Sequence, residues 1–406
     1  MQKVAIIGGG ASGIFCAMLL SLHNIPITLF EKNKILGKKL LATGNGRCNI
    51  HNTHTNSTHF QSTSFLQKDL QNILQNYPFN AFAKTCQTLG LHLHTQENGK
   101  AYPLSNSAKS VLEIFTHTLN ANPNLQIHLN TEITAITKSD SNFLLHSHNH
   151  TTSFKTLILA CGSQAAPKLG GSNKGEILAK QLNLKHHQAY PALVPIRLDS
   201  TFDCLSGVKI KAQLTLKENT QILAQTLDDV LFTNYGISGF GALDISSFIQ
   251  MRKNLTLLLN FLPNLTPKTL ENALQNTLKN HSKIPLETLL GGFLHPKIAQ
   301  MFAGHFNFNP NNTKQRKQFI FTLQNFPCKN PHFKDFESAE VCGGGISGME
   351  INPNTMESKK HKRLYIIGEM LDIVGNRGGY NLAFAWASAY ICAKAVLGKL
   401  NNFISC

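Results

Sequence analysis

The sequence predicts an α/β fold in which both ends of the chain build one domain and the middle of the chain forms an insert. Three observations support this prediction. Buried strands alternate with helical patterns at both ends, short runs of alternating hydrophobicity begin near Pro191, and a helical pattern comes after them. The expected segments are residues 1–188 and 335–406 for the α/β domain and residues 189–334 for the insert, which is β-rich over 189–265 and helical over 266–326.

The N-terminal pattern is a β-α-β unit. Residues 3–8 are apolar, rich in β-branched side chains and end at a glycine, which is typical of a buried parallel strand. Residues 11–23 repeat apolar side chains at helical spacing, and residues 25–31 form a second strand that ends at Glu31. We expect a polar loop over residues 38–63 to follow.

The elements expected after this loop alternate in the same way. We expect helices over residues 64–90, 106–120 and 382–397, and strands over residues 125–136, 142–148, 155–161 and 363–368. No apolar run approaches roughly 18 residues, so no membrane-spanning helix is expected.

A glycine motif joins the first strand to the first helix. Gly8-Gly9-Gly10-Ala11-Ser12-Gly13 has the spacing G-x-G-x-x-G, and Glu31 follows 18 residues after Gly13. Gly8 would allow the tight turn, Gly10 the close approach of a pyrophosphate, and Gly13 close packing of helix on strand. Glu31 would accept hydrogen bonds from ribose hydroxyls and repel a 2′-phosphate. The motif in this context predicts a bound dinucleotide in preference to a glycine-rich turn without a ligand.

A second hexad with the same spacing covers residues 343–348. The Met349–Pro353 segment that follows cannot open a helix, so we expect a tight loop there. One dinucleotide site is therefore expected, and not two.

The C-terminal segments favour FAD over NAD as the dinucleotide. The strand over 363–368 leads to Glu369, and a glycine-rich stretch precedes a helix that starts near Asn381. FAD is long, and its flavin ring needs contacts far from the first glycine turn. The N-terminus of the late helix could point N–H groups at the N1/C2 carbonyl edge of the flavin.

Taken in order, these motifs resemble those of the bacterial HI0933-like (YhiN/BaiN-type) flavoproteins over nearly the full length. The matching segments are residues 8–13, 37–40, 46–49, 355–359, 368–372 and 378–382, with residues 235–239 in the insert. The resemblance implies a glutathione-reductase-like Rossmann domain that binds FAD non-covalently, and an insert with a β-barrel-like part and a helical part. It also implies an FAD-dependent oxidoreductase, although members of the family differ in substrate, with aminoacetone-oxidase-type and bile-acid-reductase-type names among them.

The resemblance also implies which residues line FAD. They are Gly8, Gly10, Ala11, Ser12, Gly13, Glu31, Lys32, Lys39, Gly46, Arg47, Asn49, Ile133, Glu369, Asp372, Gly379, Tyr380, Asn381 and Leu382. We expect three more residues to line FAD. Ala160 and Gly162 belong to the small-residue turn that ends the strand over 155–161, and Gly368 precedes Glu369. Asn45, Met370 and Phe240 stand where glycine, valine and proline are common in the family.

No catalytic acid or base and no metal site is predicted. Arg47 could hold either the cofactor pyrophosphate or a substrate carboxylate, with the cofactor preferred. Cys48 has no partner cysteine close in sequence, so packing is the preferred interpretation. The spacing of His51, His54 and His59 is too loose to indicate a metal or a covalent flavin, and Tyr235 and Tyr380 are candidate proton donors that more often have structural roles.

The charge balance gives only weak evidence about partners. Lys and Arg number 38 against 22 Asp and Glu, which leaves +16 spread over the chain. The densest cluster, residues 359–363, is interpreted as a solvated loop in preference to a nucleic-acid patch. We expect hydride transfer between FAD and a small-molecule substrate or NAD(P)H. Either NAD(P)H is a transient electron donor, or the substrate supplies the electrons and oxygen accepts them. An RNA-binding, tRNA-modifying flavoprotein and a flavin-binding regulator without turnover are the alternatives.

The nine cysteines bear on the cellular compartment. Their number is odd and no C-x-x-C pair occurs, which argues against a disulfide framework. Reduced thiols predict a cytoplasmic protein.

Overall fold

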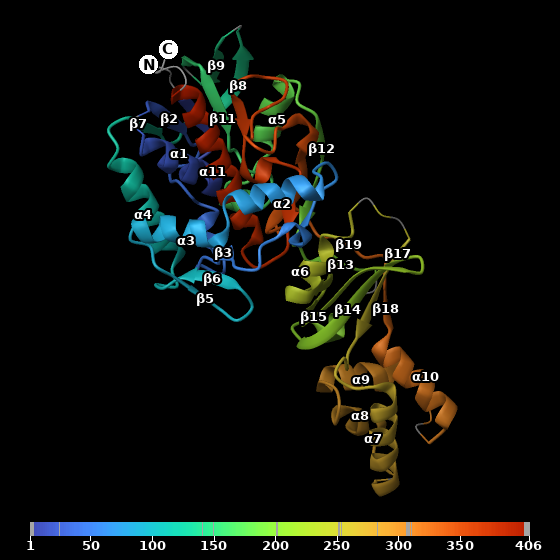
Figure 1. Cartoon of the computed structure of the whole chain (residues 1–406). Helices are drawn as coiled ribbons and strands as arrows, with labels where there is room; N and C mark the ends of the chain where they lie inside the picture. The colour runs from blue at the N-terminus through green and yellow to red at the C-terminus, as the bar shows by residue number, and fades with distance from the viewer. Residues whose placement is uncertain are drawn as a thin grey trace. The chain divides into compact units, whose positions relative to one another are not determined.

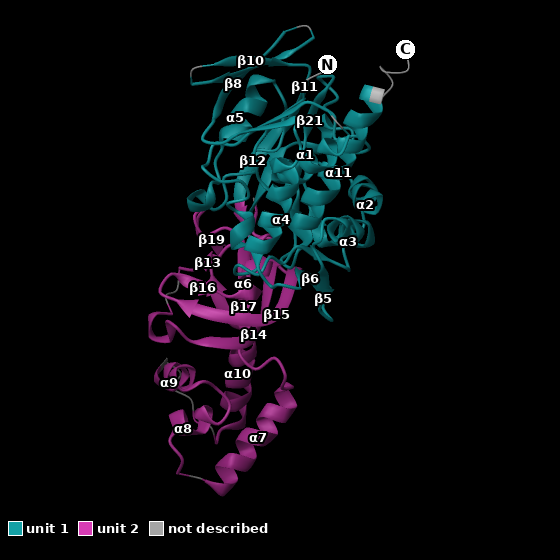
Figure 2. Cartoon of the chain, turned by 90° about the vertical axis from the view of Figure 1, so that its left-hand side faces the viewer, with its two compact units in different colours: residues 1–190, 340–406 teal, residues 191–339 magenta. Residues whose placement is uncertain are grey.

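Two structural units divide the chain in the computed structural model, which describes residues 4–23, 25–139, 141–148, 150–199, 202–250, 252, 254–281, 283–305, 309 and 311–401. Unit 1 comprises Met1–Tyr190 and Glu340–Cys406, and unit 2 comprises Pro191–Ala339 (Figure 2). The chain therefore leaves unit 1 after Tyr190 and returns to it at Glu340.

A parallel five-stranded sheet forms the centre of unit 1. Its order is β21 (Leu364–Ile366), β11 (Thr156–Leu159), β1 (Val4–Ile7), β2 (Ile27–Phe30) and β7 (Leu125–His128), and every neighbouring pair is parallel. All four residues of β1 are buried, as expected for a central strand of a parallel sheet that is covered on both faces. This arrangement is a Rossmann-type α/β fold, and it brings the two chain ends together in one sheet.

Helices from both ends of the chain pack together in unit 1. α1 (Ala11–Ser21) lies against α11 (Tyr380–Asn401), as Figure 1 shows. The Phe15 ring on α1 packs edge to face against the Trp386 ring on α11, with 5.2 Å between the ring centroids. Trp386 is fully buried, and its Nε1 donates to the Ile50 carbonyl at 2.8 Å. The further helices of this unit are α2 (Gln67–Asn76), α3 (Phe79–Thr88), α4 (Ala108–Asn120) and α5 (Lys174–Gln181).

α11 is apolar for much of its length. The segment Tyr380–Leu400 is long and apolar enough, by composition alone, to cross a membrane, which differs from the sequence expectation. In the structure 61% of its most apolar window is buried inside unit 1, as in a core helix of a folded domain. The hydropathy of α11 therefore reflects its packing against α1 and its neighbours.

Several short strands of unit 1 differ from what the sequence predicted. The segment expected as a loop over 38–63 contains β3 (His51–Asn52) and β4 (Phe60–Gln61), which pair with β6 (Lys100–Pro103) and β22 (Val374–Gly375). These pairings are far apart in sequence, so no local pattern indicates them. The hexad expected as a tight loop is mostly strand, because β20 covers Val341–Ile346 and only a 3-10 turn follows it.

The segment expected as one strand over 125–136 is also two elements. β7 belongs to the parallel sheet, whereas β8 (Ile133–Lys138) joins an antiparallel sheet with β9 (Phe143–Ser147) and β10 (Thr151–Phe154). The remaining strands of unit 1 are β5 (Leu93–Thr95), which pairs with β6, and β12 (His186–Ala192), which begins in this unit and pairs with β20.

Unit 2 has its own sheet and its own core. The sheet order is β18 (Phe326–Lys329), β17 (Leu255–Asn260), β14 (Lys209–Glu218), β15 (Gln221–Thr233), β16 (Gly236–Ser238), β13 (Ile196–Arg197) and β19 (His332–Phe333). All of its pairs are antiparallel. Only two residues separate β18 from β19, so the stretch 326–333 pairs with β17 at one end and with β13 at the other. The Asp199 N–H, just after β13, also donates to the Lys329 carbonyl at 3.3 Å. The two ends of the strand order therefore meet in one segment, as in the barrel-like part expected for the insert.

The helices of unit 2 complete its core. They are α6 (Phe240–Ser246), α7 (Pro267–Asn280), α8 (Leu286–Gly291), α9 (Pro296–His305) and α10 (Thr313–Gln324). Leu270, Leu274 and Leu278 repeat at helical spacing on α7 and are buried. They share one apolar cluster with strand residues such as Leu257 and Leu259.

Candidate functional site

The turn between β1 and α1 has a geometry that requires glycine. Gly8 has a φ of +109°, and a Cβ at this position would lie 2.3 Å from the Ala160 carbonyl oxygen. A Cβ on Gly13 would lie 1.9 Å from the Gly8 carbonyl oxygen. Both contacts are too short for any side chain. The two glycines therefore allow α1 to pack directly on the C-terminal ends of β1 and β11.

The N-terminus of α1 is open to a ligand. Gly10 is the N-cap residue, with extended backbone, and no side chain caps this end of the helix. The first turn carries no acidic residue, and a Cβ on Gly10 would meet nothing within 4 Å. The unpaired N–H groups of the first turn and the positive end of the helix dipole suit a pyrophosphate here.

Glu31 fixes this turn from the end of β2. Its side chain is 7% exposed, and its Oε2 accepts a hydrogen bond from the Gly9 N–H at 2.7 Å. Its Oε1 accepts from the backbone N–H and the side-chain Nδ2 of Asn33 at 2.8 and 2.5 Å. A carboxylate has about four acceptor sites, so one remains for a ribose hydroxyl. The sequence pattern did not predict the contact with Gly9.

Lys32 and Ile133 lie near Glu31. The Thr131 N–H donates to the Glu31 carbonyl at 2.9 Å, which brings the start of β8 to the end of β2. Ile133, the first residue of β8, is buried. The Lys32 Nζ donates to the Ser172 hydroxyl at 2.7 Å. Both residues therefore lie near the acid expected to bind the adenosine ribose.

The C-terminal half of the chain returns to the N-terminus of α1 at Gly368. This residue has a φ of +68°, and a Cβ there would lie 2.4 Å from the Ser12 hydroxyl oxygen. Its N–H donates to the Ser388 hydroxyl at 3.1 Å. The structure therefore brings residues 8–13 and 368–369, which are separated by most of the sequence, into one site.

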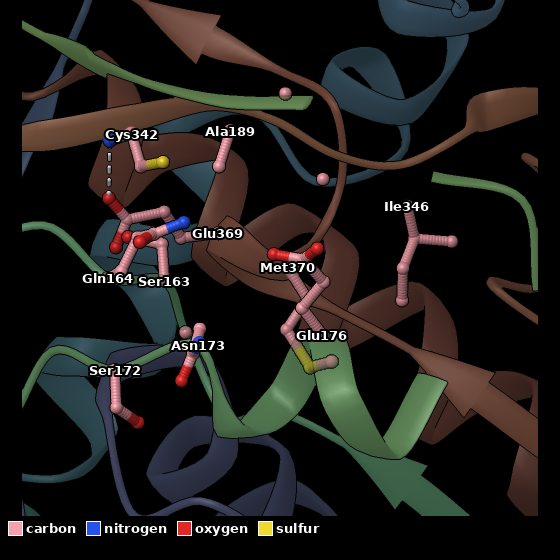
Figure 3. A pocket seen from close by; sticks show the side chains of 13 residues that line it. Ser163, Gln164, Ser172, Asn173, Glu176, Ala189, Cys342, Ile346, Glu369 and Met370 are labelled. Carbon is pink, nitrogen blue, oxygen red and sulfur yellow. Dashed lines mark hydrogen bonds between the residues drawn. The ribbon is translucent and has the colours of Figure 1, made fainter. Parts of the chain in front are cut away.

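Glu369 forms an ion pair at the edge of this site. Its carboxylate lies 2.8 Å from the Lys39 Nζ, and its Oε1 accepts from the Cys342 N–H at 3.1 Å. A small cavity that opens to solvent lies beside it, and its lining combines polar residues such as Ser163, Ser172 and Glu176 with small or apolar ones such as Gly162 and Ile346. Figure 3 shows Ser163 and Gln164 next to the Glu369 carboxylate. Hydroxyl, amide and carboxylate groups of this kind suit the hydroxyl-rich ribityl chain of a flavin.

A second group of predicted residues gathers at the N-terminus of α11. A Cβ on Gly379 (φ +97°) would lie 2.4 Å from the His51 carbonyl oxygen. In the amide orientation that satisfies both of its ends, Asn49 accepts from the Gly379 N–H at 3.3 Å. Asn381 accepts from the Gly375 N–H and donates to the Gly375 carbonyl, both at 2.8 Å. Asn49 and Asn381 therefore hold the two loops that meet where α11 begins, and the partly exposed Leu382 lies in its first turn.

Asp372 has a bonding pattern that the sequence did not reveal. Its side chain is 1% exposed, and its Oδ2 accepts from the Thr63 N–H at 3.0 Å and the Thr63 hydroxyl at 2.7 Å. The hydroxyls of Ser64 and Ser62 donate to the same oxygen at 2.7 and 3.3 Å. This carboxylate holds the 62–64 segment to the C-terminal part of unit 1.

Tyr380 and His59 form a stacked pair. Their ring centroids lie 4.4 Å apart, with an angle of 12° between the ring planes. Burial lowers the pKa of His59 and raises the pKa of Tyr380, so both rings are neutral near pH 7. The sequence named both residues but gave no sign that they meet.

His51 and Cys48 are buried beneath this region. The His51 Nδ1 accepts from the Asn52 N–H at 2.8 Å, and burial lowers the pKa of His51 to about 4. Burial raises the pKa of the Cys48 thiol to about 11, which keeps it protonated. Both environments therefore favour a packing role for His51 and Cys48 over a catalytic one.

Tyr235, the other candidate proton donor, belongs to unit 2. The Lys334 Nζ lies 4.4 Å from the centroid of its ring, a cation–π contact within that unit. This contact gives the Tyr235 ring a structural partner that the sequence did not indicate.

The glycine turn, Glu31 and the cavity beside Glu369 together fit FAD, and the parallel sheet on which they stand is of the Rossmann type. The protein is an FAD-dependent oxidoreductase. Residues 2–395 match the family model described as the HI0933-like protein Rossmann domain, so the chain belongs to the HI0933-like family.

Two relatives of known name are similar over nearly their whole length. One is the 3-dehydro-bile acid delta(4,6)-reductase of Clostridium scindens, which is 29% identical in sequence. The alignment covers 97% of this chain and 99% of the reductase. The other is the ribosomal RNA dihydrouridine synthase of Escherichia coli, which is 28% identical, with 98% of each chain aligned.

A solved structure has the same fold. The open conformation of a flavocytochrome c3 fumarate reductase matches with a TM-score of 0.52 and 13% identity. The match covers 98% of this chain and 78% of that one.

Proposed function

We propose that the protein transfers a hydride between non-covalently bound FAD and either a small organic substrate or NAD(P)H. The observation that carries this proposal is the meeting of the glycine turn with Gly368 and Glu369. Because of this meeting, Glu31 and the cavity beside Glu369 both lie next to the glycine turn. The reductase from Clostridium scindens, which is similar over nearly its full length, supports a reductive reaction. We also assign unit 1 to the glutathione-reductase-like branch of Rossmann folds.

Different residues of unit 1 would bind different parts of the cofactor. The first turn of α1 would donate N–H groups to the phosphates, and Glu31 would accept from a ribose hydroxyl. Glu369 and Ser163 would hold hydroxyls of the ribityl chain, and the N-terminus of α11 would favour negative charge on the reduced ring. When bound, FAD supplies the two-electron redox chemistry, and the protein supplies orientation and electrostatics.

NAD(P)H would act only as a visiting electron donor. The segment after β20 forms a 3-10 turn over Gly348–Glu350 and not the α-helix that a second dinucleotide site of this kind requires. The eight described cysteines are all free, and this supports our proposal that the protein works in the reducing cytoplasm.

The test is a rapid-mixing experiment on purified protein. We expect a yellow protein that releases intact FAD on heating and whose flavin is bleached anaerobically by NADH, NADPH or an organic donor. Reoxidation by oxygen or by an organic acceptor then separates an oxidase from a reductase. A colourless preparation that does not take up FAD would refute the proposal. A bound flavin that no donor reduces would favour a regulator without turnover.

A second candidate is an RNA-modifying flavoprotein. The relative from Escherichia coli is named for ribosomal RNA, and this chain carries a formal charge of +16. In the basic cluster over 359–363, Lys360 and His361 bond to the carbonyls of Asn183 and Leu182, whereas Lys359 and Lys362 are exposed. A salt-dependent gel shift with ribosomal RNA and tRNA transcripts tests this candidate. No shift at low salt would dismiss it.

A further inference from the structure

A cationic surface lies beside the start of α11, and the cofactor site described above does not account for it. It is formed by Arg47, Lys100, Tyr102 and Gly378, and we call it the Arg47–Lys100 surface. We propose that it binds the anionic group, a carboxylate or a phosphate, of the molecule that exchanges a hydride with the flavin. This inference rests on the proposed function and adds the chemical class of the substrate.

The loop that carries Arg47 is held in one conformation. Gly44, Asn45, Gly46 and Cys48 all have positive φ angles, from +56° to +81°. The N–H groups of Gly46 and Cys48 donate to the Thr43 carbonyl at 3.1 and 2.9 Å. The Gly46 carbonyl accepts from the Ala108 N–H at 2.7 Å, which ties the loop to the start of α4. A loop fixed in this way presents Arg47 at little further entropic cost.

Arg47 itself lies over an aromatic ring. Its guanidinium carbon is 5.5 Å from the centroid of Tyr102, which is only 6% exposed. Its Nε donates to the Gly44 carbonyl at 3.3 Å. The side chain is otherwise exposed, so the two terminal nitrogens are available to a ligand. Two parallel N–H groups on a planar fork match the oxygens of a carboxylate or a phosphate.

Lys100 lies on the same face of β6 as Tyr102, two residues away along the strand. Its Cε is 3.3 Å from the position that a Cβ on Gly378 would take, and the Tyr380 ring lies 3.7 Å from the same point. The Asn52 Nδ2 donates to the Gly378 carbonyl at 2.9 Å and fixes this part of the loop. Lys100 therefore lies where α11 begins and next to Tyr380.

Nothing in the described part of the chain neutralises these two cations. Neither Arg47 nor Lys100 forms an ion pair there, whereas Lys39 in the cofactor site is paired with Glu369. The first turn of α11 has no acidic residue, so the positive end of its dipole adds to the field. The hairpin of β5 and β6 contains one carboxylate, Glu97, which is exposed. The surface thus offers two unpaired cations to an anion, next to the end of α11 that is assigned to the flavin ring.

The test titrates the FAD-loaded protein with two probes, sodium benzoate for a carboxylate and inorganic phosphate for a phosphate. Binding is followed by calorimetry and by the shift of the flavin spectrum. We expect one probe to saturate and to bind at least about tenfold more weakly to Arg47→Gln and to Lys100→Gln. The control is Lys138→Gln, an exposed lysine on β8, which should bind both probes and FAD like the parent protein.

Three results would overturn the inference. The first is that neither probe binds saturably, and the second is that both variants bind the probe as tightly as the parent protein. The third is that Arg47→Gln loses as much affinity for FAD as for the probe. The last result would make Arg47 a cofactor ligand. Reduction of the flavin is measured separately, so the two proposals can fail independently. A flavin that NAD(P)H reduces without anion binding refutes only the Arg47–Lys100 surface, and anion binding to a flavin that no donor reduces refutes only hydride transfer.

Discussion

The Ser12 hydroxyl oxygen lies 2.4 Å from the point where a Cβ on Gly368 would stand. Ser12 is in the first turn of α1, and Gly368 begins the 3-10 turn after β21. Because the space is filled and Gly368 has a φ of +68°, the two ends of the chain can meet here only through a glycine.

Gly368→Ala should therefore damage the site. The new methyl group would displace Ser12 from the first turn of α1, and the positive φ would add strain. We expect a loss of about 1–3 kcal/mol in the free energy of unfolding and weaker FAD binding. The control is Gly398→Ala, because a Cβ on Gly398 in α11 meets nothing within 4 Å. Denaturant unfolding and FAD titration check both variants, and equal stability of the two would contradict this account of Gly368.

Glu31→Ala should weaken FAD binding by about 1–3 kcal/mol, because it leaves a ribose hydroxyl and the Gly9 N–H without their acceptor. Glu31→Gln should recover part of this loss, since the amide oxygen can still accept one hydrogen bond. Glu113→Gln, at an exposed position on α4, serves as the control. An FAD affinity that does not change in Glu31→Ala would remove this carboxylate from the site.

Asp372→Asn should release the segment over 62–64. One oxygen of Asp372 accepts four hydrogen bonds from this segment, and the buried amide can replace only part of that pattern. We expect faster backbone hydrogen exchange over 62–64, while the exposed control Asp203→Asn in unit 2 should leave exchange there unchanged. Exchange that does not change in Asp372→Asn would show that the segment is held by other contacts.

His51 should make the protein less stable in mild acid. Its pKa is about 4 in the folded protein against an ordinary value of 6.5, because burial opposes the charged form. Between these two values only the unfolded chain takes up the proton. The stabilisation is therefore complete above pH 6.5 and is lost as the pH falls towards 4, by about 3 kcal/mol in total.

His51→Phe should remove this part of the pH dependence. Unfolding free energies measured at neutral pH and near pH 4.5 should differ less in this variant than in the parent protein. His150→Gln, at an exposed position, should behave like the parent. The same pH dependence in His51→Phe and in the parent would assign the effect to other groups.

The sequence was sufficient for the parts of the fold that depend on local patterns. The strand, the glycine turn and the helix over residues 3–23 follow from apolar periodicity and glycine spacing, and β1 and α1 are where these patterns put them. The family motifs also predicted the class of enzyme, which the family match over residues 2–395 confirms, because the residues of each motif are close together in sequence even when their contacts are not.

The parts that were missed depend on contacts between distant residues. β3 and β4 exist because β6 and β22 supply their partners, and two-residue strands leave no periodic signal. The bonding of Asp372 to Thr63 and the stacking of Tyr380 on His59 join segments about three hundred residues apart. A run of Ser and Thr before a helix gives no indication of the acid that it will meet.

Hydride transfer to or from bound FAD is the step on which the proposed function depends. The most direct measurement is anaerobic mixing of the FAD-loaded protein with NADPH, NADH and small organic donors, each unlabelled and deuterated at the transferred hydrogen. At least one donor should bleach the flavin absorbance, and the deuterated form of that donor should do so more slowly. Hydride transfer would be contradicted if no donor bleaches a correctly loaded flavin. It would also be contradicted if, for every donor that does, deuteration leaves the rate of flavin reduction unchanged.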